Sequence, residues 1–240
     1  MQLSDAGNGA IGVTIIIPAF NEARTILTLL QRVAKQNVDG ISFDVLVVDD
    51  GSTDETVAIL EANPQMYGQL IKLETNRGKG GAVIAGLKAA KGDYVLFQDA
   101  DLEYDPADYG RLLVPIIRYG ADIVMGSRLI APELTRVHYF WNKVGNRMIT
   151  LLFNLLHNTT FTDIYSCYLC LRRELVEPQS LVSNGWGQQA EILSKATQRA
   201  RVIYEAPISY HGRTYAEGKK IRARHVIDVI VMMIRSRLGT

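Results

Sequence analysis

The amino-acid sequence predicts an α/β fold with a mostly parallel central sheet flanked by helices. Short β-branched segments alternate with amphipathic segments four times over about a hundred residues, which is the pattern of βαβ units. Polar clusters follow several of the expected strands, and sheets of this kind bind ligands at the carboxyl ends of their strands. The composition, 48% apolar and 21% charged over 240 residues, is that of a folded domain.

The first half of the chain supplies the clearest elements. A strand is expected at residues 13–18, because Val13 opens a β-branched run that Pro18 ends. A helix follows at about residues 22–36, with its apolar residues on one stripe. The same patterns predict strands at 43–48, 69–73 and 94–98, and helices at 54–62 and 78–90.

The second half is more mixed. Its patterns predict strands at 121–125, 165–172 and 201–204, and helices at 141–157, 188–198 and 223–238. Residues 1–11 are small and polar, and we expect a flexible N-terminal tail there. We therefore predict one folded domain at 12–222, followed by an amphipathic C-terminal helix within 223–240.

Charge and cysteine content exclude some classes of protein. The net charge of +1, from 26 basic and 25 acidic residues, argues against a general nucleic-acid binder. Basic residues gather after Arg199, which favours an anionic partner near the end of the chain. Cys167 and Cys170 lie within an expected strand, where residues three apart point to opposite faces. We therefore expect core residues, and neither a redox pair nor half a metal site.

An acidic pair follows the strand expected at 94–98. Alternate strand residues share a face, so Asp99 and Asp101 are expected side by side. Two adjacent carboxylates repel each other unless a cation lies between them, and hard oxygen ligands suit Mg²⁺ or Mn²⁺. The pattern is short and acidic pairs also cap helices, but its position after a buried strand favours a metal site.

Two further clusters lie where strands end or helices begin. Asp49 and Asp50 end the second expected strand, where they could cap the next helix or accept hydrogen bonds from a nucleotide. The glycine-rich segment 77–81 opens a helix, and a helix N-terminus attracts phosphate. Lys79 could neutralise a diphosphate there, although the segment could equally be an ordinary turn.

Several motifs in order carry a family resemblance. They are Ile-Pro-Ala-Phe-Asn-Glu at 17–22, Val-Val-Asp-Asp-Gly-Ser-Thr-Asp at 47–54, Asn-Arg-Gly-Lys-Gly at 76–80, Asp-Ala-Asp at 99–101 and Gly-Ser-Arg at 126–128. Together they resemble family 2 glycosyltransferases with the GT-A fold of nucleotide-diphospho-sugar transferases. Within that family, the dolichol-phosphate mannose synthase and polyprenyl-phosphate glycosyltransferase branch is the most similar. The resemblance covers roughly residues 13–221 and implies that 12–222 is a GT-A catalytic domain.

The resemblance also implies roles for individual residues. The implied nucleotide-sugar site consists of Pro18, Ala19, Phe20, Glu22, Asp49, Asp50, Lys79, Gln98, Asp99 and Ala100. The implied ligands of Mg²⁺ or Mn²⁺ are Asp99, Asp101 and Glu103, where Glu103 replaces a Gln of some relatives. Arg128, Arg213 and Lys219 match acceptor-phosphate contacts, and Lys220, Arg136 and Lys143 are further cationic candidates.

The implied activity is inverting transfer of a hexose, mannose or glucose, from GDP-mannose or UDP-glucose to a dolichyl- or undecaprenyl-type phosphate. The metal, held in part by Asp101, would neutralise the leaving diphosphate together with Lys79 and Arg213, and Arg128 would contact the acceptor phosphate. A phosphate acceptor is already anionic and needs no general base. The alternative is transfer to a sugar or protein hydroxyl, with Glu191 or Asp163 as general base. Residues 188–191 lack the Glu-Asp pair common in hydroxyl-directed relatives, which favours the phosphate acceptor.

Two other classes of function are less favoured. A nucleotidyltransferase usually carries a basic glycine-rich loop after its first strand, and residues 18–22 are not one. A non-catalytic nucleotide-sugar sensor would lack part of the site, and no part is visibly missing.

The sequence also predicts contact with a membrane. No signal peptide is visible, and no apolar run approaches the roughly 20 residues that span a bilayer. Segments 141–157 and 225–237 combine apolar and basic residues, as helices at membrane surfaces do, although core packing is the simpler explanation for the first. We expect peripheral binding at the cytoplasmic face of a membrane, or contact with a membrane partner subunit.

Overall fold

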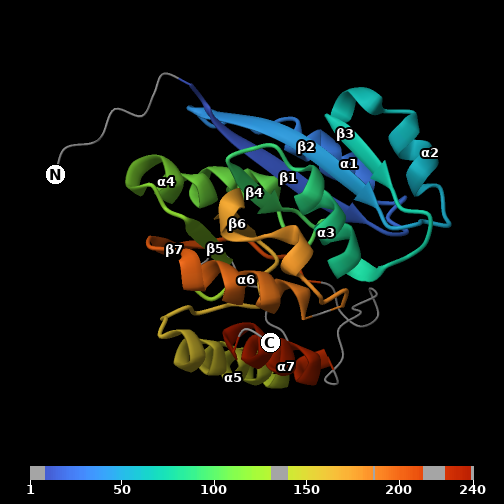
Figure 1. Ribbon diagram of the computed structural model, residues 1–240. Coiled ribbons are helices and arrows are strands. Elements are labelled where there is room, and N and C mark those ends of the chain that lie inside the picture. The colour runs from blue at the N-terminus through green and yellow to red at the C-terminus, as the bar shows by residue number, and fades with distance from the viewer. Residues whose placement is uncertain (1–8, 131–139, 186, 213–224, 239–240) are drawn as a thin grey trace.

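A computed structural model describes residues 9–130, 140–185, 187–212 and 225–238 (Figure 1). The strands are β1 (Ile11–Ala19), β2 (Ile41–Asp49), β3 (Gln69–Lys72), β4 (Tyr94–Phe97), β5 (Ile123–Ser127), β6 (Leu169–Arg172) and β7 (Ile203–Pro207). The α-helices are α1 (Ile26–Val33), α2 (Thr56–Glu61), α3 (Gly78–Ala89), α4 (Tyr109–Tyr119), α5 (Phe140–His157), α6 (Gln188–Arg199) and α7 (His225–Leu238). Short 3₁₀ helices are η1 (Pro64–Met66), η2 (Pro106–Asp108), η3 (Arg173–Leu175) and η4 (Pro178–Ser180).

The strands form one sheet in the order β3-β2-β1-β4-β6-β5-β7. Neighbouring strands pair in parallel except around β6, which is antiparallel to both β4 and β5. The predicted mostly parallel sheet is therefore confirmed. Because β1, β2, β4 and β5 all run the same way, their carboxyl ends meet at one edge of the sheet.

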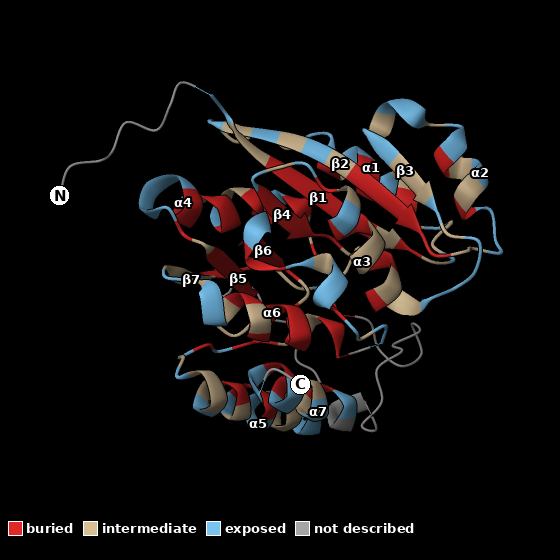
Figure 2. Cartoon of the chain, viewed as in Figure 1, coloured by how far each residue is buried: buried red, intermediate tan, exposed pale blue. Residues whose placement is uncertain are grey.

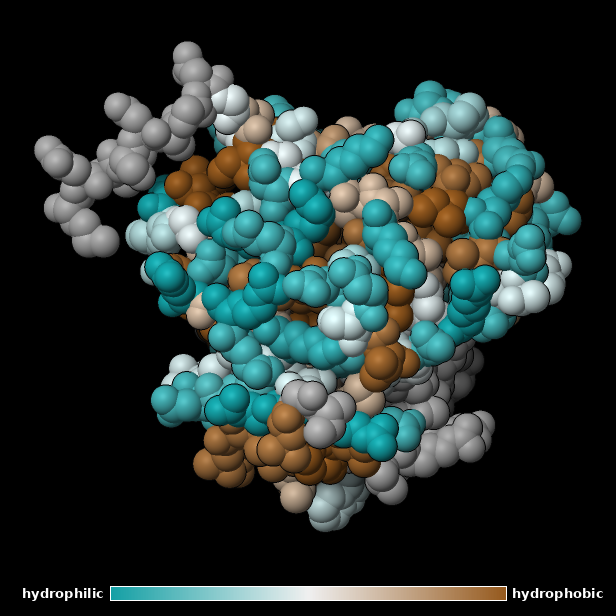
Figure 3. Space-filling view, viewed as in Figure 1, coloured by the Kyte–Doolittle hydropathy of each residue, from teal (hydrophilic) through white to brown (hydrophobic). Residues whose placement is uncertain are grey.

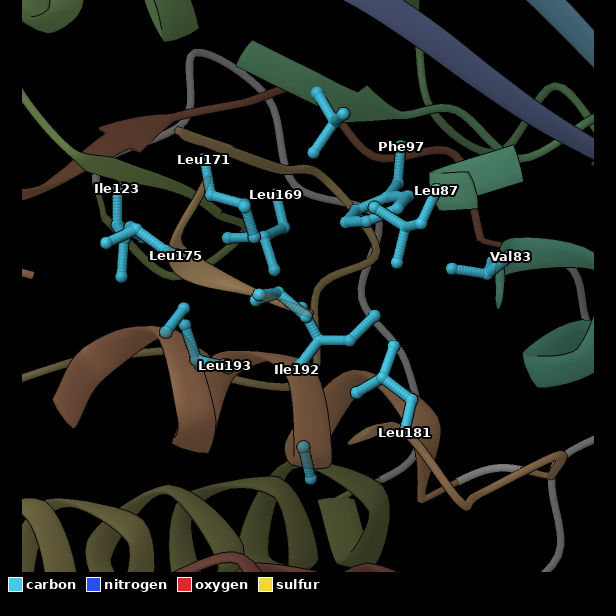
Figure 4. Close-up of a cluster of buried hydrophobic side chains, with 14 of the residues drawn as sticks. Val83, Leu87, Phe97, Ile123, Leu169, Leu171, Leu175, Leu181, Ile192 and Leu193 are labelled. Atoms are coloured by element: carbon cyan, nitrogen blue, oxygen red, sulfur yellow. The ribbon is translucent and has the colours of Figure 1, made fainter. Parts of the chain in front are cut away.

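The two faces of the sheet bury separate apolar clusters. On one face α1 and α4 pack on the alternate strand residues Val13, Ile15 and Ile17 of β1. On the other face α3 and α6 cover Ile16 and Phe97. Figure 4 shows Val83 and Leu87 of α3 and Ile192 and Leu193 of α6 pointing into the same cluster as Phe97, Leu169 and Leu171.

A further layer lies outside α6. There α5 and α7 pack side by side, and α7 also lies against α6 (Figure 1). The inward residues of this layer are buried and its outward residues are exposed (Figure 2). No helix in the described ranges is long and apolar enough to cross a membrane.

Most predicted elements are present with shifted ends, and three differences have physical reasons. Strand β1 begins at Ile11, so the last residue of the predicted tail belongs to the sheet, and residues 1–8 lie outside the described residues. Helix α4 was not predicted, and it contains Pro115, which reads as a helix breaker. Strand β6 begins only at Leu169, so Cys167 lies outside any strand.

Candidate active site

The loops that follow β1 and β2 are joined by side-chain hydrogen bonds. Asn21 has a φ of 55°, and its Oδ1 accepts the Thr53 backbone N–H at 2.8 Å. The Ser52 and Thr56 hydroxyls accept the backbone N–H groups of Asn21 and Glu22 at 3.0 and 2.9 Å. These hydroxyl residues therefore connect the two loops, and Asp54 Oδ1 accepts the backbone N–H of Thr56 at the start of α2 at 3.0 Å.

A cavity of about 370 Å³ opens at the carboxyl edge of the sheet. The predicted residues that line it are Pro18, Ala19, Phe20, Glu22, Asp50, Lys79, Asp99, Ala100, Asp101, Glu103 and Arg128. Four predicted residues do not line it, namely Asp49, Gln98, Asp163 and Glu191. Arg213, Lys219, Lys220 and Arg136 lie outside the described residues, and Lys143 is exposed on α5 away from the cavity.

The acidic pair at the end of β2 is fixed by backbone groups. Asp50 Oδ1 accepts the Arg77 backbone N–H at 2.8 Å, while burial raises the pKa of Asp50. Asp49 is 2% exposed, and its Oδ2 accepts the Ser52 backbone N–H at 3.1 Å. Its Oδ1 is buried without a hydrogen-bond partner among the described residues.

The acidic pair after β4 lies in a turn. Because β4 ends at Phe97, the expected strand alternation does not apply to Asp99 and Asp101, although both line the cavity. Asp99 Oδ1 lies 2.5 Å from Lys79 Nζ, and Asp101 Oδ1 accepts the Glu103 backbone N–H at 3.1 Å. A φ of 64° at Leu102 redirects the chain within this turn.

The predicted ligands Asp99, Asp101 and Glu103 do not form a ready-made three-carboxylate group in the described part of the chain. The described residues contain no group of three His, Cys, Asp or Glu side chains placed to hold one ion. Glu103 Oε2 instead accepts the Tyr210 hydroxyl at 2.9 Å. Asp99 and Asp101 still fit Mg²⁺ or Mn²⁺, because such ions are commonly held by one or two carboxylates together with substrate phosphates.

Lys79 is charged in this setting. Burial alone would lower its pKa, but the Asp99 carboxylate outweighs burial and raises it. Lys79 Nζ also donates to Cys167 Sγ at 3.2 Å. Burial and Asp99 raise the pKa of Cys167 to about 12, so this side chain is a thiol. The core prediction is thus confirmed for Cys170 and wrong for Cys167, which lines the cavity.

The glycine-rich segment at the start of α3 makes room for another loop. Gly78 has a φ of 77°, and a Cβ there would lie 2.5 Å from the Asn184 carbonyl oxygen. A Cβ on Gly80 would lie 2.7 Å from Asn184 Cα, and the Gly80 N–H donates to the Asn184 oxygen at 3.0 Å. The close backbone approach is therefore made by the chain that precedes α6.

Gln98 does not line the cavity but hydrogen-bonds to residues next to it. The Tyr109 and Tyr168 hydroxyls donate to Gln98 Oε1 at 2.8 and 2.6 Å. Gln98 Nε2 donates to the Asp99 carbonyl oxygen at 3.0 Å. The predicted sugar or nucleotide contact at this fully buried residue is therefore corrected to a structural one.

Arg128 enters the cavity from the end of β5 and is held by Asp163. Its Nε and Nη2 donate to the two Asp163 carboxylate oxygens at 2.7 and 2.8 Å, and its backbone N–H donates at 3.1 Å. Asn146 Nδ2 donates to Asp163 Oδ1 at 2.9 Å. The Arg128 guanidinium also lies over the Tyr210 ring, 4.9 Å from its centre.

The two predicted general bases are both engaged by other groups. Burial alone would raise the pKa of Asp163, but Arg128 and Asn146 hold it below its usual range. Glu191 is 1% exposed and accepts the Val182 and Ser183 backbone N–H groups at 3.1 and 2.9 Å. It also forms an ion pair with Lys195 at 3.0 Å. Neither carboxylate lines the cavity.

Several cavity residues were not identified from the sequence. They are Tyr104, Tyr165, Cys167, Asn184, Gln188 and Tyr210. Tyr104 follows Glu103, and Tyr210 lies three residues before Arg213. In both segments only the charged residue was predicted to belong to the site. Gln188 is 5% exposed and lines the cavity at the start of α6. No sequence signal distinguishes it from its neighbours.

Comparisons with known proteins agree with this arrangement. Residues 14–178 match the family described as "Glycosyl transferase family 2". The chain is 32% identical over 84% of its length to "Glycosyltransferase AglJ" of Haloferax volcanii, covering 63% of that protein. It is 29% identical over 86% of its length to a dolichol-phosphate mannosyltransferase of Pyrococcus furiosus, covering 58%. The chain thus spans less than two thirds of the length of these relatives.

Two further comparisons extend the likeness. A UDP-N-acetylglucosamine–dolichyl-phosphate N-acetylglucosaminyltransferase of Methanococcus voltae is 28% identical, with 93% of this chain and 96% of that protein covered. The crystal structure of glucosyl-3-phosphoglycerate synthase from Mycobacterium tuberculosis, with Mn²⁺, uridine diphosphate and glucosyl-3-phosphoglycerate, superposes with a TM-score of 0.68. It is 21% identical, with 95% of this chain and 80% of that chain covered. The fold is the GT-A fold predicted from the sequence, and the chain belongs to glycosyl transferase family 2.

Proposed function

We propose that this protein transfers a hexose from a nucleoside-diphosphate sugar to a polyprenyl phosphate, with inversion at the sugar carbon and with Mg²⁺ or Mn²⁺. One observation carries the proposal. A single cavity presents the carboxylates Asp50, Asp99 and Asp101 and the guanidinium of Arg128, while both candidate bases are engaged elsewhere. With a divalent cation held by the carboxylates, such a site would bind and neutralise phosphates, and neither predicted base lines the cavity.

The donor would bind at the carboxylate side of the cavity. Asp50 lines the cavity there and offers its carboxylate to an N–H or O–H group of the nucleotide. When bound by Asp99 and Asp101, the metal would supply positive charge to the diphosphate. Lys79 is charged and adjoins Asp99, so it can donate to the leaving diphosphate as negative charge develops there.

The acceptor would bind on the Arg128 side. A phosphate is already anionic near neutral pH, so its attack needs cations to hold it beside the donor and needs no proton removal. Arg128 provides a planar donor group suited to phosphate oxygens. The relatives from P. furiosus and M. voltae are named for transfer to dolichyl phosphate, which supports the same acceptor class here.

The outer face of α5 and α7 supports a lipid-borne acceptor. Its apolar residues include Trp141, Met148, Leu151 and Leu155 of α5, which are 77%, 66%, 59% and 74% exposed. Hydrophobic surface gathers at the lower end of Figure 3, where the α5 and α7 layer lies in Figure 1. Lys143 and Arg147 on α5 and Arg235 and Arg237 on α7 are also exposed. An apolar face with cations is suited to an anionic membrane surface, and we place the enzyme at the cytoplasmic face of a membrane.

The test is a transfer assay with purified protein and Mg²⁺ or Mn²⁺. GDP-mannose, UDP-glucose and UDP-N-acetylglucosamine are supplied separately, with and without polyprenyl phosphate in vesicles. The third donor is included because the M. voltae relative is named for it. Asp101→Asn should abolish lipid-linked product, because it removes a cavity carboxylate. Glu61→Gln is the matched control, since Glu61 lies in an exposed ion pair with Lys72.

The outcomes separate the claims. Product that requires lipid phosphate, survives Glu61→Gln and is lost in Asp101→Asn supports the proposal and identifies the donor. Donor binding with transfer only to a sugar or protein hydroxyl would refute the phosphate acceptor. Undiminished transfer after metal chelation would refute the proposed metal.

A further inference from the structure

Helix α5 has two unlike sides. Trp141, Met148, Leu151 and Leu155 form its exposed apolar side. The opposite side carries Asn146, Thr150 and Asn154, which are spaced four residues apart and so lie in one row along the helix. The row faces the chain between α5 and β6, where Asp163 is located.

Each member of the row hydrogen-bonds to that segment. Asn154 Nδ2 donates to the Phe161 carbonyl oxygen at 2.8 Å, and Asn154 Oδ1 accepts the Phe161 N–H at 3.0 Å. Thr150 Oγ1 accepts the Ile164 N–H at 3.4 Å. Asn146 makes the one side-chain bond of the row that ends on a charged group, at 2.9 Å from Asp163 Oδ1.

Asp163 links Asn146 to Arg128, which lines the cavity. Its Oδ1 accepts from both Asn146 Nδ2 and Arg128 Nη2, and its Oδ2 accepts from Arg128 Nε. The carboxylate is fully buried, whereas the Arg128 side chain is 18% exposed and lines the cavity. The rotation of the carboxylate therefore decides the direction in which the rest of the guanidinium faces.

We propose that Asn146 is a positioning residue, which fixes Asp163 and through it the orientation of Arg128 toward the acceptor phosphate. The inference rests on the proposed function, because it assigns the acceptor side of the same cavity. The inference also connects α5 with the cavity. Asn146, which orients Arg128 through Asp163, lies on the same helix as the exposed apolar residues. Asn146 has no second task within the described residues, because its Oδ1 is buried without a hydrogen-bond partner.

The experiment compares two asparagines of the same row in the 240-residue chain. Asn146→Leu keeps the side-chain volume and removes the donor to Asp163. Asn154→Leu is the matched control, because it removes helix-to-segment hydrogen bonds without touching Asp163. Asn146→Ser, which keeps a donor on a shorter side chain, is made in case Asn146→Leu does not fold.

The expected result is a split between kinetic constants. Asn146→Leu should raise the KM for polyprenyl phosphate about ten-fold, equivalent to roughly 1.4 kcal/mol, and leave the KM for the donor unchanged. Asn146→Ser should raise the acceptor KM by a smaller factor, and Asn154→Leu should leave it unchanged. A wild-type acceptor KM in Asn146→Leu, or an equal rise in Asn154→Leu, would overturn the inference.

A second readout is independent of turnover. The Nε–H signal of Arg128 in ¹⁵N-arginine spectra, assigned with Arg128→Lys, should be protected from solvent exchange in the unsubstituted chain and in Asn154→Leu. It should lose that protection in Asn146→Leu. Absence of transfer by the unsubstituted chain would refute the proposed function alone, whereas an unchanged Arg128 signal in Asn146→Leu would refute the role of Asn146.

Discussion

The two cationic side chains described at the cavity each form an ion pair with a carboxylate. Lys79 binds Asp99 and Arg128 binds Asp163, so each cation is held in place by a carboxylate from elsewhere in the chain. Buried pairs of this kind add little net stability, but removing one partner leaves an uncompensated charge and costs about 3–5 kcal/mol. The pairing of Arg128 therefore has more to do with direction than with stability.

The alternative acceptor class is tested at Glu191. Its carboxylate accepts backbone N–H groups from Val182 and Ser183, and we expect Glu191→Gln to lower the free energy of unfolding by about 1–3 kcal/mol. At a temperature where the variant is folded, kcat should stay within about three-fold, because a phosphate acceptor needs no base. Urea unfolding and the transfer assay measure both. A fall in kcat of about 10²–10⁴ would instead mark Glu191 as a general base.

At the scale of elements, glycines let α3 approach the chain before α6. A Cβ on Gly80 would meet Asn184 at 2.7 Å, and the backbone there has no flexible end that could move aside. Asn184 and Lys79 line the same cavity, so the packing of α3 against the chain before α6 affects the width of the cavity.

The substitution Gly80→Ala should therefore weaken donor binding. We expect at least a ten-fold rise in the Kd of the nucleotide sugar, measured by calorimetry, together with a loss of about 1–3 kcal/mol of stability from overpacking. Gly110→Ala is the control, because nothing lies within 4 Å of its added Cβ. That change in α4 should stabilise the protein by about 0.5–1 kcal/mol and leave the Kd unchanged.

The junction of α5, α6 and α7 contains a titratable group. His157 stacks on Phe153 and shares a hydrogen bond with Ser194, and burial and then Arg237 lower its pKa to about 4. Because the unfolded chain binds this proton more readily, the stabilising contribution is complete above the unfolded pKa of about 6.5 and is lost as pH falls toward 4. We expect about 1–2 kcal/mol less stability at pH 5 than at pH 7.5. Denaturant titrations of His157→Gln should show a smaller loss over that range, and an equal loss would contradict the assignment.

Local patterns predicted those elements whose signal is contained in a short window. The β-branched run of β1 and the glycine-led start of α3 are of this kind, and they also located Asp49, Asp50, Asp99 and Asp101. Local patterns could not predict contacts between segments far apart in the chain. Examples are the antiparallel insertion of β6 and the contact between Tyr210 and Glu103. The same holds for the hydrogen bond between Asp163 and Arg128, which joins residues 35 positions apart.

The molecule as a whole is layered from the sheet outward. The cavity lies at the carboxyl edge of the sheet, and the α5 and α7 layer lies beyond α6 (Figure 1). This arrangement places an exposed apolar face and the cavity of the proposed phosphate site on one domain. Under the proposed function, a lipid phosphate reaches the cavity while its chain stays in the membrane.

Vesicle binding tests this arrangement. The double substitution Leu151→Asp with Leu155→Asp removes apolar area from the exposed face of α5 and adds negative charge. We expect co-sedimentation with anionic vesicles to fall at least ten-fold, and binding by the unsubstituted chain to weaken as salt is raised. Ile117→Asp is the control, since Ile117 is 42% exposed on α4, across the sheet. Equal losses in both variants would show that the α5 face is not the site of contact.

The polar row on α5 also bears on how the enzyme can be produced and engineered. A helix with an exposed apolar face is a common choice for deletion when a more soluble protein is wanted. Here its interior side bonds to the segment that carries Asp163, so trimming the helix would remove the support of Arg128. Solubility is better improved by replacing the exposed apolar residues of α5 with polar ones. Asn146, Thr150 and Asn154 should then be kept.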